Sequence, residues 1–209
     1  MTTIGNLFPV CSRLAGPLAC LLLVAGCAPG MENIRVDLPA YQSAGAPASP
    51  PGASAKVQVE SVADSRTDSV GSHVGERTTI GDVSMGSIDL EPLPTMLMAQ
   101  VLKAELAKMG HQVVSSGAQF SVGGKLLKFQ VLTPATAVYW DINGEIELAL
   151  AVKNQAGVAY DGHYSATCTD RTYVWPGEEI IGKVVADCAG KIGASLRGDA
   201  ALAKFLSTP

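Results

Sequence analysis

The segment 138–152 constrains the fold of this chain more than any other part of the sequence. Apolar and polar residues alternate along its whole length, and one side carries Trp140, Ile142, Gly144, Ile146, Leu148, Leu150 and Val152. The other side carries Asp141, Asn143, Glu145 and Glu147. Successive side chains of a strand point to opposite faces, so this pattern predicts one buried face and one wet face. Such a strand is typical of an antiparallel sheet that is covered on one side.

The neighbouring segments supply the rest of the fold. Further strands are predicted at residues 56–60, 119–131 and 158–169. Helices with a continuous apolar stripe follow Pro94 and Gly177. Residues 64–91, rich in Gly, Ser and Asp, are predicted to form a long loop, in which residues 78–80 could form a short strand. The sequence therefore predicts an α+β fold, a two-layer sandwich of an antiparallel sheet with two helices on one face, in the order βαβββα.

Residues 1–26 have the parts of a bacterial lipoprotein signal peptide. A leader with one positive charge, Arg13, is followed by an apolar run at residues 14–24, which is too short to span a bilayer. Two small residues then precede Cys27, as in a lipobox. The pattern predicts cleavage before Cys27 and acylation of that cysteine with diacylglycerol and an N-acyl chain such as palmitate. An ordinary secretory signal with an incidental cysteine is the alternative.

Residues 27–55 are predicted to be a lipidated cysteine and a flexible tether rich in Pro, Ala, Ser and Gly, followed by one periplasmic domain at 56–209. The alternating residues 34–38 could still dock on that domain. Ala28 follows the cysteine, whereas Asp at this position usually retains lipoproteins of Gram-negative bacteria at the inner membrane. Because Ala28 is not Asp, this resemblance to lipoproteins of Gram-negative bacteria predicts that the chain is lipid-anchored in the outer membrane and faces the periplasm.

Two cysteines remain in the predicted domain, Cys168 and Cys188, and two separate periodic patterns place them in its core. Cys168 lies on the apolar face of the strand at 158–169, and Cys188 lies in the apolar stripe of the second helix. We predict a disulfide, which for a loop near this size stabilises by about 3 kcal/mol. Two reduced core cysteines, too far apart to bond, are the alternative.

Composition and motifs exclude several classes of function. Without residues 1–26 the net charge is −5, and no basic stripe is present, so nucleic acid is not an expected partner. The three histidines are scattered, which predicts no metal site. Residues 177–183 match the start of a phosphate-binding loop, but Val184 stands where a hydroxyl must hold magnesium. We expect no catalytic residues, no cofactor and no enzymatic activity.

One polar cluster remains as a candidate functional site. Asp64, Arg66 and Asp68 lie in the run Asp-Ser-Arg-Thr-Asp directly after the first strand of the predicted domain. An Asp and an Arg at this spacing can close a turn by side-chain hydrogen bonds. The other interpretation is a partner-binding loop on a rigid scaffold.

The chain resembles the YajG family of outer-membrane lipoproteins. The resemblance rests on the lipobox at Cys27, Asp64–Asp68, Leu102–Val113, Asn143–Val152 and Asp199–Leu206. It implies an envelope location and no established activity. More distantly, the layout is similar to auxiliary lipoproteins of ABC-type transport and lipopolysaccharide-assembly systems.

Two functions are consistent with these features. The first is a membrane-anchored envelope lipoprotein with a non-enzymatic structural or partner-binding domain, whose partner is an envelope protein. The second is an accessory lipoprotein of a lipid or lipopolysaccharide transport system. The second function requires an apolar groove, which Leu127, Phe129 and Val131 would form if they faced outward. Gly123–Gly124 in the same strand suggests a β-bulge.

Overall fold

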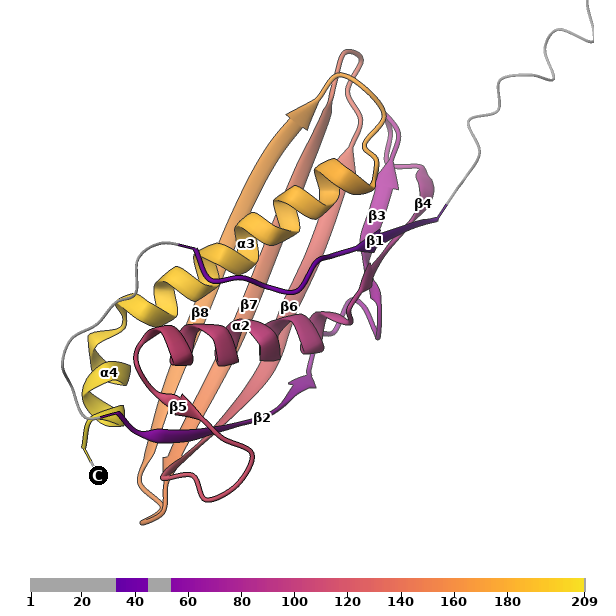
Figure 1. Cartoon of the computed structure of the whole chain (residues 1–209). Helices are drawn as coiled ribbons and strands as arrows, with labels where there is room; N and C mark the ends of the chain where they lie inside the picture. Colours follow the sequence, from indigo (N-terminus) through magenta and orange to yellow (C-terminus); the bar gives the residue numbers. More distant parts are fainter. Residues whose placement is uncertain (1–32, 45–53, 209) are drawn as a thin grey trace, which may run out of the picture. The chain divides into compact units, whose positions relative to one another are not determined.

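The computed structural model describes residues 33–44 and 54–208 of the chain. Three long strands form its centre: β6 (Phe120–Pro134), β7 (Trp140–Asn154) and β8 (Ala159–Thr172). They pair antiparallel in chain order, with β7 between the other two (Figure 1). The predicted apolar face of β7 is buried from Ile142 to Val152. The alternation therefore predicted both the strand and the side that faces the core.

The other edge of β6 is shared by two shorter strands. β2 (Lys56–Asp64) pairs in parallel with the first half of β6, and β3 (His73–Thr78) pairs in parallel with its second half. Strand β5 (Gln112–Val113) pairs in parallel with β2. Strand β4 (Ser84–Glu91) joins β3 antiparallel, and β1 (Ile34–Asp37) joins β4 in parallel. The two-layer α+β sandwich is confirmed, but its eight-stranded sheet is mixed rather than wholly antiparallel.

The predicted loop at residues 64–91 is wrong over half of its length, which forms β3 and β4 rather than one short strand near residue 78. Its glycine content caused the error. A Cβ atom on Gly75 would lie 1.8 Å from the carbonyl oxygen of Val131, so glycine is required where β3 approaches β6. Glycine in a strand often marks such a close approach of two backbones.

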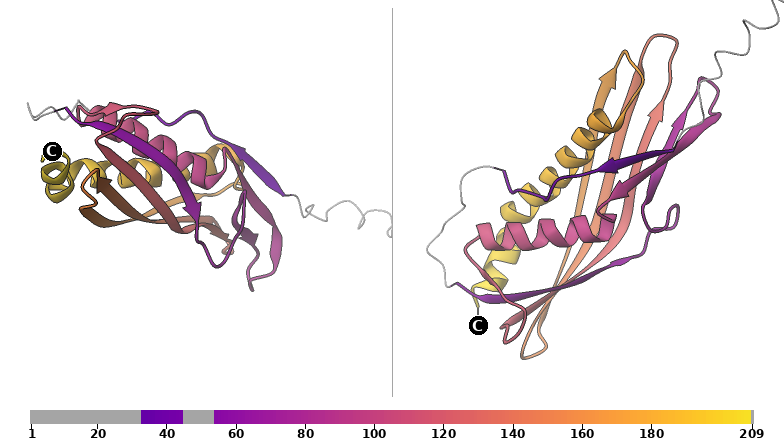
Figure 2. Two further views of the ribbon diagram at one scale, coloured as in Figure 1. Left: turned by 90° about the horizontal axis from the view of Figure 1, so that it is seen from below. Right: turned by 45° about the vertical axis from the view of Figure 1, so that its right-hand side comes forward.

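The helices cover one face of the sheet (Figures 1 and 2). They are α2 (Pro94–Lys108), α3 (Glu178–Gly198) and the short α4 (Ala200–Leu206). The predicted stripe of the second helix is fully buried in α3, as Ile181, Val185, Cys188, Ile192 and Leu196. Within the described residues, none of the helices is long and apolar enough to cross a membrane.

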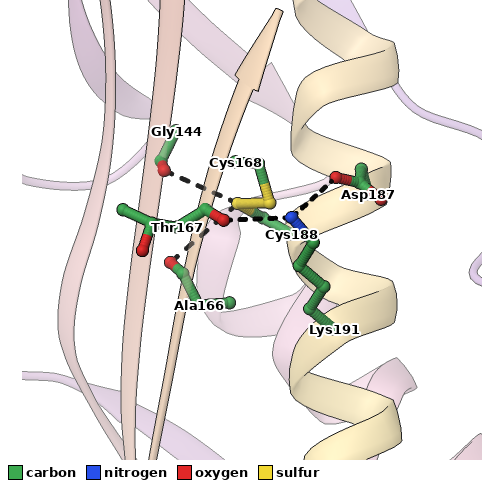
Figure 3. The surroundings of a disulfide bond; sticks show 7 residues. All are labelled: Gly144, Ala166, Thr167, Cys168, Asp187, Cys188 and Lys191. Carbon is green, nitrogen blue, oxygen red and sulfur yellow. Dashed lines mark hydrogen bonds and ion pairs between the residues drawn. A yellow bond between two sulfur atoms is a disulfide. The ribbon is translucent and has the colours of Figure 1, made fainter.

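The disulfide links these two layers and confirms the prediction from periodicity. Cys168 of β8 and Cys188 of α3 are bonded, with their Cα atoms 5.6 Å apart (Figure 3). The sulfur of Cys188 lies 3.6 Å from the carbonyl oxygen of Gly144 on β7. A Cβ atom on Gly144 would lie 3.0 Å from Val184, so this glycine lets α3 pack closely on the sheet.

The N-terminal part of the described chain also belongs to the domain. β1 pairs with β4, as the alternation at residues 34–38 allowed. Residues 38–44, which we call the strap, then cross the helix layer. The Tyr41 amide donates to the side chain of Gln100 (3.2 Å), and Lys108 donates to the carbonyls of Ser43 and Ala44. Of the predicted tether, only residues 27–32 and 45–53 lie outside the described residues.

Candidate functional site

Asp64 and Arg66 bind each other at the end of β2. The Arg66 guanidinium donates through Nε to Asp64 Oδ1 (2.8 Å) and through a terminal nitrogen to Oδ2 (2.7 Å). The Arg66 side chain is 2% exposed, so this two-bond ion pair is shielded from water on one side. The hydrogen bond from Arg66 is the main reason that the pKa of Asp64 lies below its usual value.

The same guanidinium closes the loop that follows. It donates to the carbonyl oxygens of His73 (2.9 Å) and Gly71 (2.8 Å), so Arg66 spans the loop from its beginning to its end. The turn-closing role considered for this motif is therefore present. Asp68 and Val70 take no part in these guanidinium hydrogen bonds and are exposed, Val70 by 82%. Asp64 and Arg66 fix the loop, and Asp68 and Val70 are available for contact.

A pocket of about 180 Å³ lies beside this loop on the uncovered side of the sheet. Its walls include Asp68 from the loop, Glu76 from β3, and Leu127 and Lys128 from β6. Lys128 forms an ion pair with Glu145 (2.7 Å), and this hydrogen bond raises the pKa of Lys128. The pocket thus combines apolar side chains with charges of both signs, a mixture suited to a protein surface.

The apolar groove expected from Leu127, Phe129 and Val131 is absent, because only Leu127 faces outward. Phe129 and Val131 are 2% and 1% exposed and belong to the core under the helices. The register of β6 against β7 shifts between Leu126 and Lys128, which reverses the phase of all later side chains. The bulge was expected at Gly123–Gly124, but against β7 it lies three residues later, at Leu127. Opposite these glycines, β2 carries a second irregularity between Val59 and Val62.

The carboxylates on the wet face of β7 lie beside basic side chains of the neighbouring strands. Asp141 pairs with Arg171 at 2.8 Å, and Glu147 lies 3.7 Å from His163. Residues 33–44 and 54–208 contain no group of three His, Cys, Asp or Glu side chains that could hold a metal ion. The run 177–183 forms the N-cap and first turns of α3 rather than a phosphate-binding loop.

Sequence analysis missed a buried polar cluster beneath the strap. Glu105 of α2 is 0% exposed, accepts a hydrogen bond from the Tyr41 hydroxyl (2.6 Å) and pairs with Arg197 of α3. Burial, together with the bond to Glu105, raises the pKa of Tyr41 above its usual value. A Cβ atom on Gly193 would lie 2.5 Å from Glu105, so the cluster depends on glycine there. The cluster fastens the strap to both helices.

A second missed cluster joins β8 to α4. Asp199 accepts hydrogen bonds from the hydroxyls of Tyr160 and Tyr164, and its other oxygen caps α4 by accepting from the Ala201 and Leu202 amides. Burial opposes ionisation of Asp199, but these hydrogen bonds outweigh it and hold its pKa below the usual value. Burial is also the main reason that the pKa of Tyr164 is raised. No short motif signals either cluster, because the partners are far apart in the chain.

The predicted lipidation site, Cys27, lies outside the described residues. The folded part of the chain therefore offers one pocket beside the predicted loop residues, together with structural clusters that hold the helix layer in place.

Comparison of the sequence with protein-family models assigns this chain to a family. A family model described as "Uncharacterized lipoprotein" matches residues 43–207. A comparison with curated proteins returned no match.

Several solved structures are similar to this chain at low sequence identity, and the first of those that follow shares its fold. A protein from Xanthomonas campestris, of the family DUF330, is similar with a TM-score of 0.59 and 12% identity, covering 82% of this chain and 96% of that one. An uncharacterized protein has a TM-score of 0.46 and 15% identity, with coverages of 80% and 98%. A minor lipoprotein from Acinetobacter baumannii has a TM-score of 0.38 and 11% identity, with coverages of 68% and 92%.

Proposed function

The chain belongs to this family of uncharacterized lipoproteins, and we propose that it is anchored in the outer membrane through lipid on Cys27 and faces the periplasm. In this proposal the folded domain is a non-enzymatic module of the YajG type that binds an envelope protein. The lipobox before Cys27 and the family match support the anchor. One acyl chain binds membranes marginally, and two or more anchor a protein stably.

The observation that carries partner binding is the preformed loop beside the pocket. Arg66 holds the loop by four hydrogen bonds from its guanidinium, so little conformational entropy is lost when a partner binds. The loop presents Asp68 and Val70, and Leu127 adds an apolar contact that is 37% exposed. Asp64 and Arg66 act here as positioning residues, and the exposed side chains make the contact.

Photocrosslinking in intact cells tests this function. A photoreactive residue at Val70 is expected to give one specific protein adduct, which the substitution Asp68→Lys reduces several-fold. A photoreactive residue at Val158, which is 55% exposed in the β7–β8 turn, is the matched control. The absence of any protein adduct at Val70, or the same adducts at both positions, would contradict partner binding at this loop.

A second candidate function, as a lipid-handling accessory subunit of a transport system, is favoured by one observation. An apolar hollow of about 370 Å³ lies under the strap and is lined by Leu38, Tyr41, Leu97, Ala186 and Ala189. Its volume is within the range of small-molecule sites. Mass spectrometry of the purified chain, with and without the substitution Ala186→Trp, tests this function. A co-purified lipid that the substitution removes would support it.

A further inference from the structure

We propose that the anchored domain rests on the lipid bilayer through one of its ends. We call this the aromatic end and define it as the loops 79–83, 135–139 and 173–177. The proposal rests on the anchor at Cys27, because it concerns the orientation that the anchored domain adopts. It is supported by the exposed side chains of these loops, by the contacts that hold them in place, and by the place in the domain where the described chain begins, six residues after Cys27.

The aromatic end exposes large apolar side chains. Half of the exposed large hydrophobic residues in the described chain lie in its loops: Ile80 (66% exposed), Val83 (57%), Val138 (69%), Tyr173 (73%), Val174 (72%) and Trp175 (40%). At the opposite end, defined as the loops 114–119 and 154–158 and called the far end, Val158 is the only such residue described. Contiguous exposed apolar side chains mark surfaces that bind a protein or a membrane.

Contacts between aromatic and cationic side chains hold these loops together. The rings of Trp140 and Trp175 meet edge to face with centroids 5.0 Å apart, and Tyr139 and Tyr173 do so at 6.2 Å. The guanidinium of Arg171 lies 3.7 Å from the Tyr139 ring centre. The Ala135 amide donates to the Thr78 carbonyl (2.9 Å), which joins the first loop to the second. The exposed side chains are therefore presented from a fixed framework.

The chain enters the domain next to this end. β1 is parallel to β4, so the chain enters β1 from the side of Ser84, which adjoins the loop 79–83. Asn33 accepts a hydrogen bond from the Ser87 amide (3.1 Å). Figure 1 shows the start of β1 near the β3–β4 hairpin, away from the β7–β8 turn. The six peptide links from Cys27 to Asn33 span at most about 22 Å, whatever their conformation.

The chemistry of the aromatic end fits the headgroup region of a bilayer. Tryptophan and tyrosine are enriched at membrane interfaces because their rings are apolar and their N–H and O–H groups are polar. Asp82 is the one charged residue in the three loops, which keeps the cost of entering the headgroup region low. An anchor within about 22 Å of Asn33 brings these side chains to a membrane surface without any protein partner.

Photocrosslinking in reconstituted vesicles tests the proposal. The complete chain is produced in a Gram-negative host with p-benzoylphenylalanine at Tyr173, or at Val158 as the matched far-end control. The mature protein is placed in vesicles of phosphatidylethanolamine and phosphatidylglycerol. We expect at least tenfold more lipid adduct at residue 173 than at residue 158. Both side chains are exposed, so neither label is expected to disturb folding.

The mass of the N-terminal peptide and flotation of the vesicles separate failure of the anchor from failure of the docking. A chain without lipid on Cys27 that does not float overturns the anchor and, with it, the docking. An acylated chain that floats but gives no more lipid adduct at 173 than at 158 overturns the docking alone. The same labels in intact cells show whether the aromatic end contacts lipid or protein. A protein adduct at residue 173 in place of a lipid adduct would overturn the proposed contact with the bilayer.

Discussion

The two ends of the domain use their polar and aromatic side chains differently. Toward the far end, Tyr160 and Tyr164 donate their hydroxyls to Asp199, and Arg197 pairs with the buried Glu105. At the aromatic end, Tyr173 and its neighbours pack on one another but remain exposed to solvent. The polar groups of the first set are satisfied by contacts inside the domain. The side chains of the second set remain exposed and could contact a partner or a membrane.

This difference predicts that one set of side chains stabilises the fold and that the other set is available for binding. Side chains with buried hydrogen-bond partners contribute to the free energy of unfolding, and their loss leaves partners unsatisfied. Exposed apolar side chains contribute little to folding, so their presence at one end calls for another explanation. We therefore expect substitutions in the polar clusters to affect stability and substitutions at the aromatic end to affect membrane contact. The predictions below run from the largest expected effect on stability to the smallest.

The largest effect is expected for Arg197→Ala. It leaves the fully buried Glu105 without its cation, and removing one partner of a buried pair costs about 3–5 kcal/mol of unfolding free energy. Urea unfolding of the mature domain measures the loss. The double variant Glu105→Gln, Arg197→Met is the control, because it removes both charges together and should cost less. A loss below about 1 kcal/mol in the single variant would show that the pair does not hold the helix layer.

Removing the disulfide is expected to cost about 3 kcal/mol, because it frees a loop of 20 residues in the unfolded chain. Unfolding with and without reductant measures this, and counting thiols in the denatured chain establishes the bond. The variant Cys168→Ala, Cys188→Ala should have the reduced stability and no response to reductant. If reductant leaves the wild-type midpoint unchanged although both thiols are free, the link between β8 and α3 contributes nothing to stability.

Asp199→Ala should cost about 1–2 kcal/mol, because α4 loses its N-cap and two tyrosines lose their acceptor. The pKa of Asp199 in the folded state lies below its usual value of 3.8, so its charge stabilises the fold above about pH 4. That contribution disappears as the pH falls through the folded-state pKa. Asp199→Asn should therefore flatten the loss of stability below about pH 4 relative to wild type. Equal acid sensitivity in both proteins would contradict this role.

The smallest effect on stability is expected at the aromatic end. Tyr173→Ser with Val174→Ser should change the unfolding free energy by no more than about 0.5 kcal/mol, since both side chains are more than 70% exposed. Circular dichroism during urea unfolding checks this. A loss of 2 kcal/mol or more would mean that these residues complete the core, and the contrast between the two ends would fail.

Sequence periodicity predicted those strands and helices that keep one side buried and the other exposed along their whole length. The alternation around Ile146 and the helical stripe containing Cys188 each point to one buried side, so the strand, the helix and the disulfide followed from them. The pattern of β6 was less informative, because the bulge at Leu127 moves Phe129 and Val131 to the core face. Gly75 favoured a loop, although it serves a close contact between two strands.

The candidate site was predictable only in part. Asp64 and Arg66 are two residues apart, so the sequence itself brought them together. Glu105 and Arg197 are separated by 92 residues, and their meeting depends on how α2 and α3 cross the sheet. The aromatic end is assembled from three loops that are separate in the sequence. Contacts of this kind are set by tertiary packing and leave no local pattern.

Tryptophan fluorescence tests the membrane-facing orientation most directly, because both tryptophans of the chain, Trp140 and Trp175, meet at the aromatic end. The acylated chain is bound to vesicles whose lipids carry bromine near the headgroups, with unbrominated vesicles as the reference. The account predicts that bromine quenches the emission at least twofold. Unchanged emission from a chain that remains bound to the vesicles would contradict it and place the aromatic end away from the bilayer.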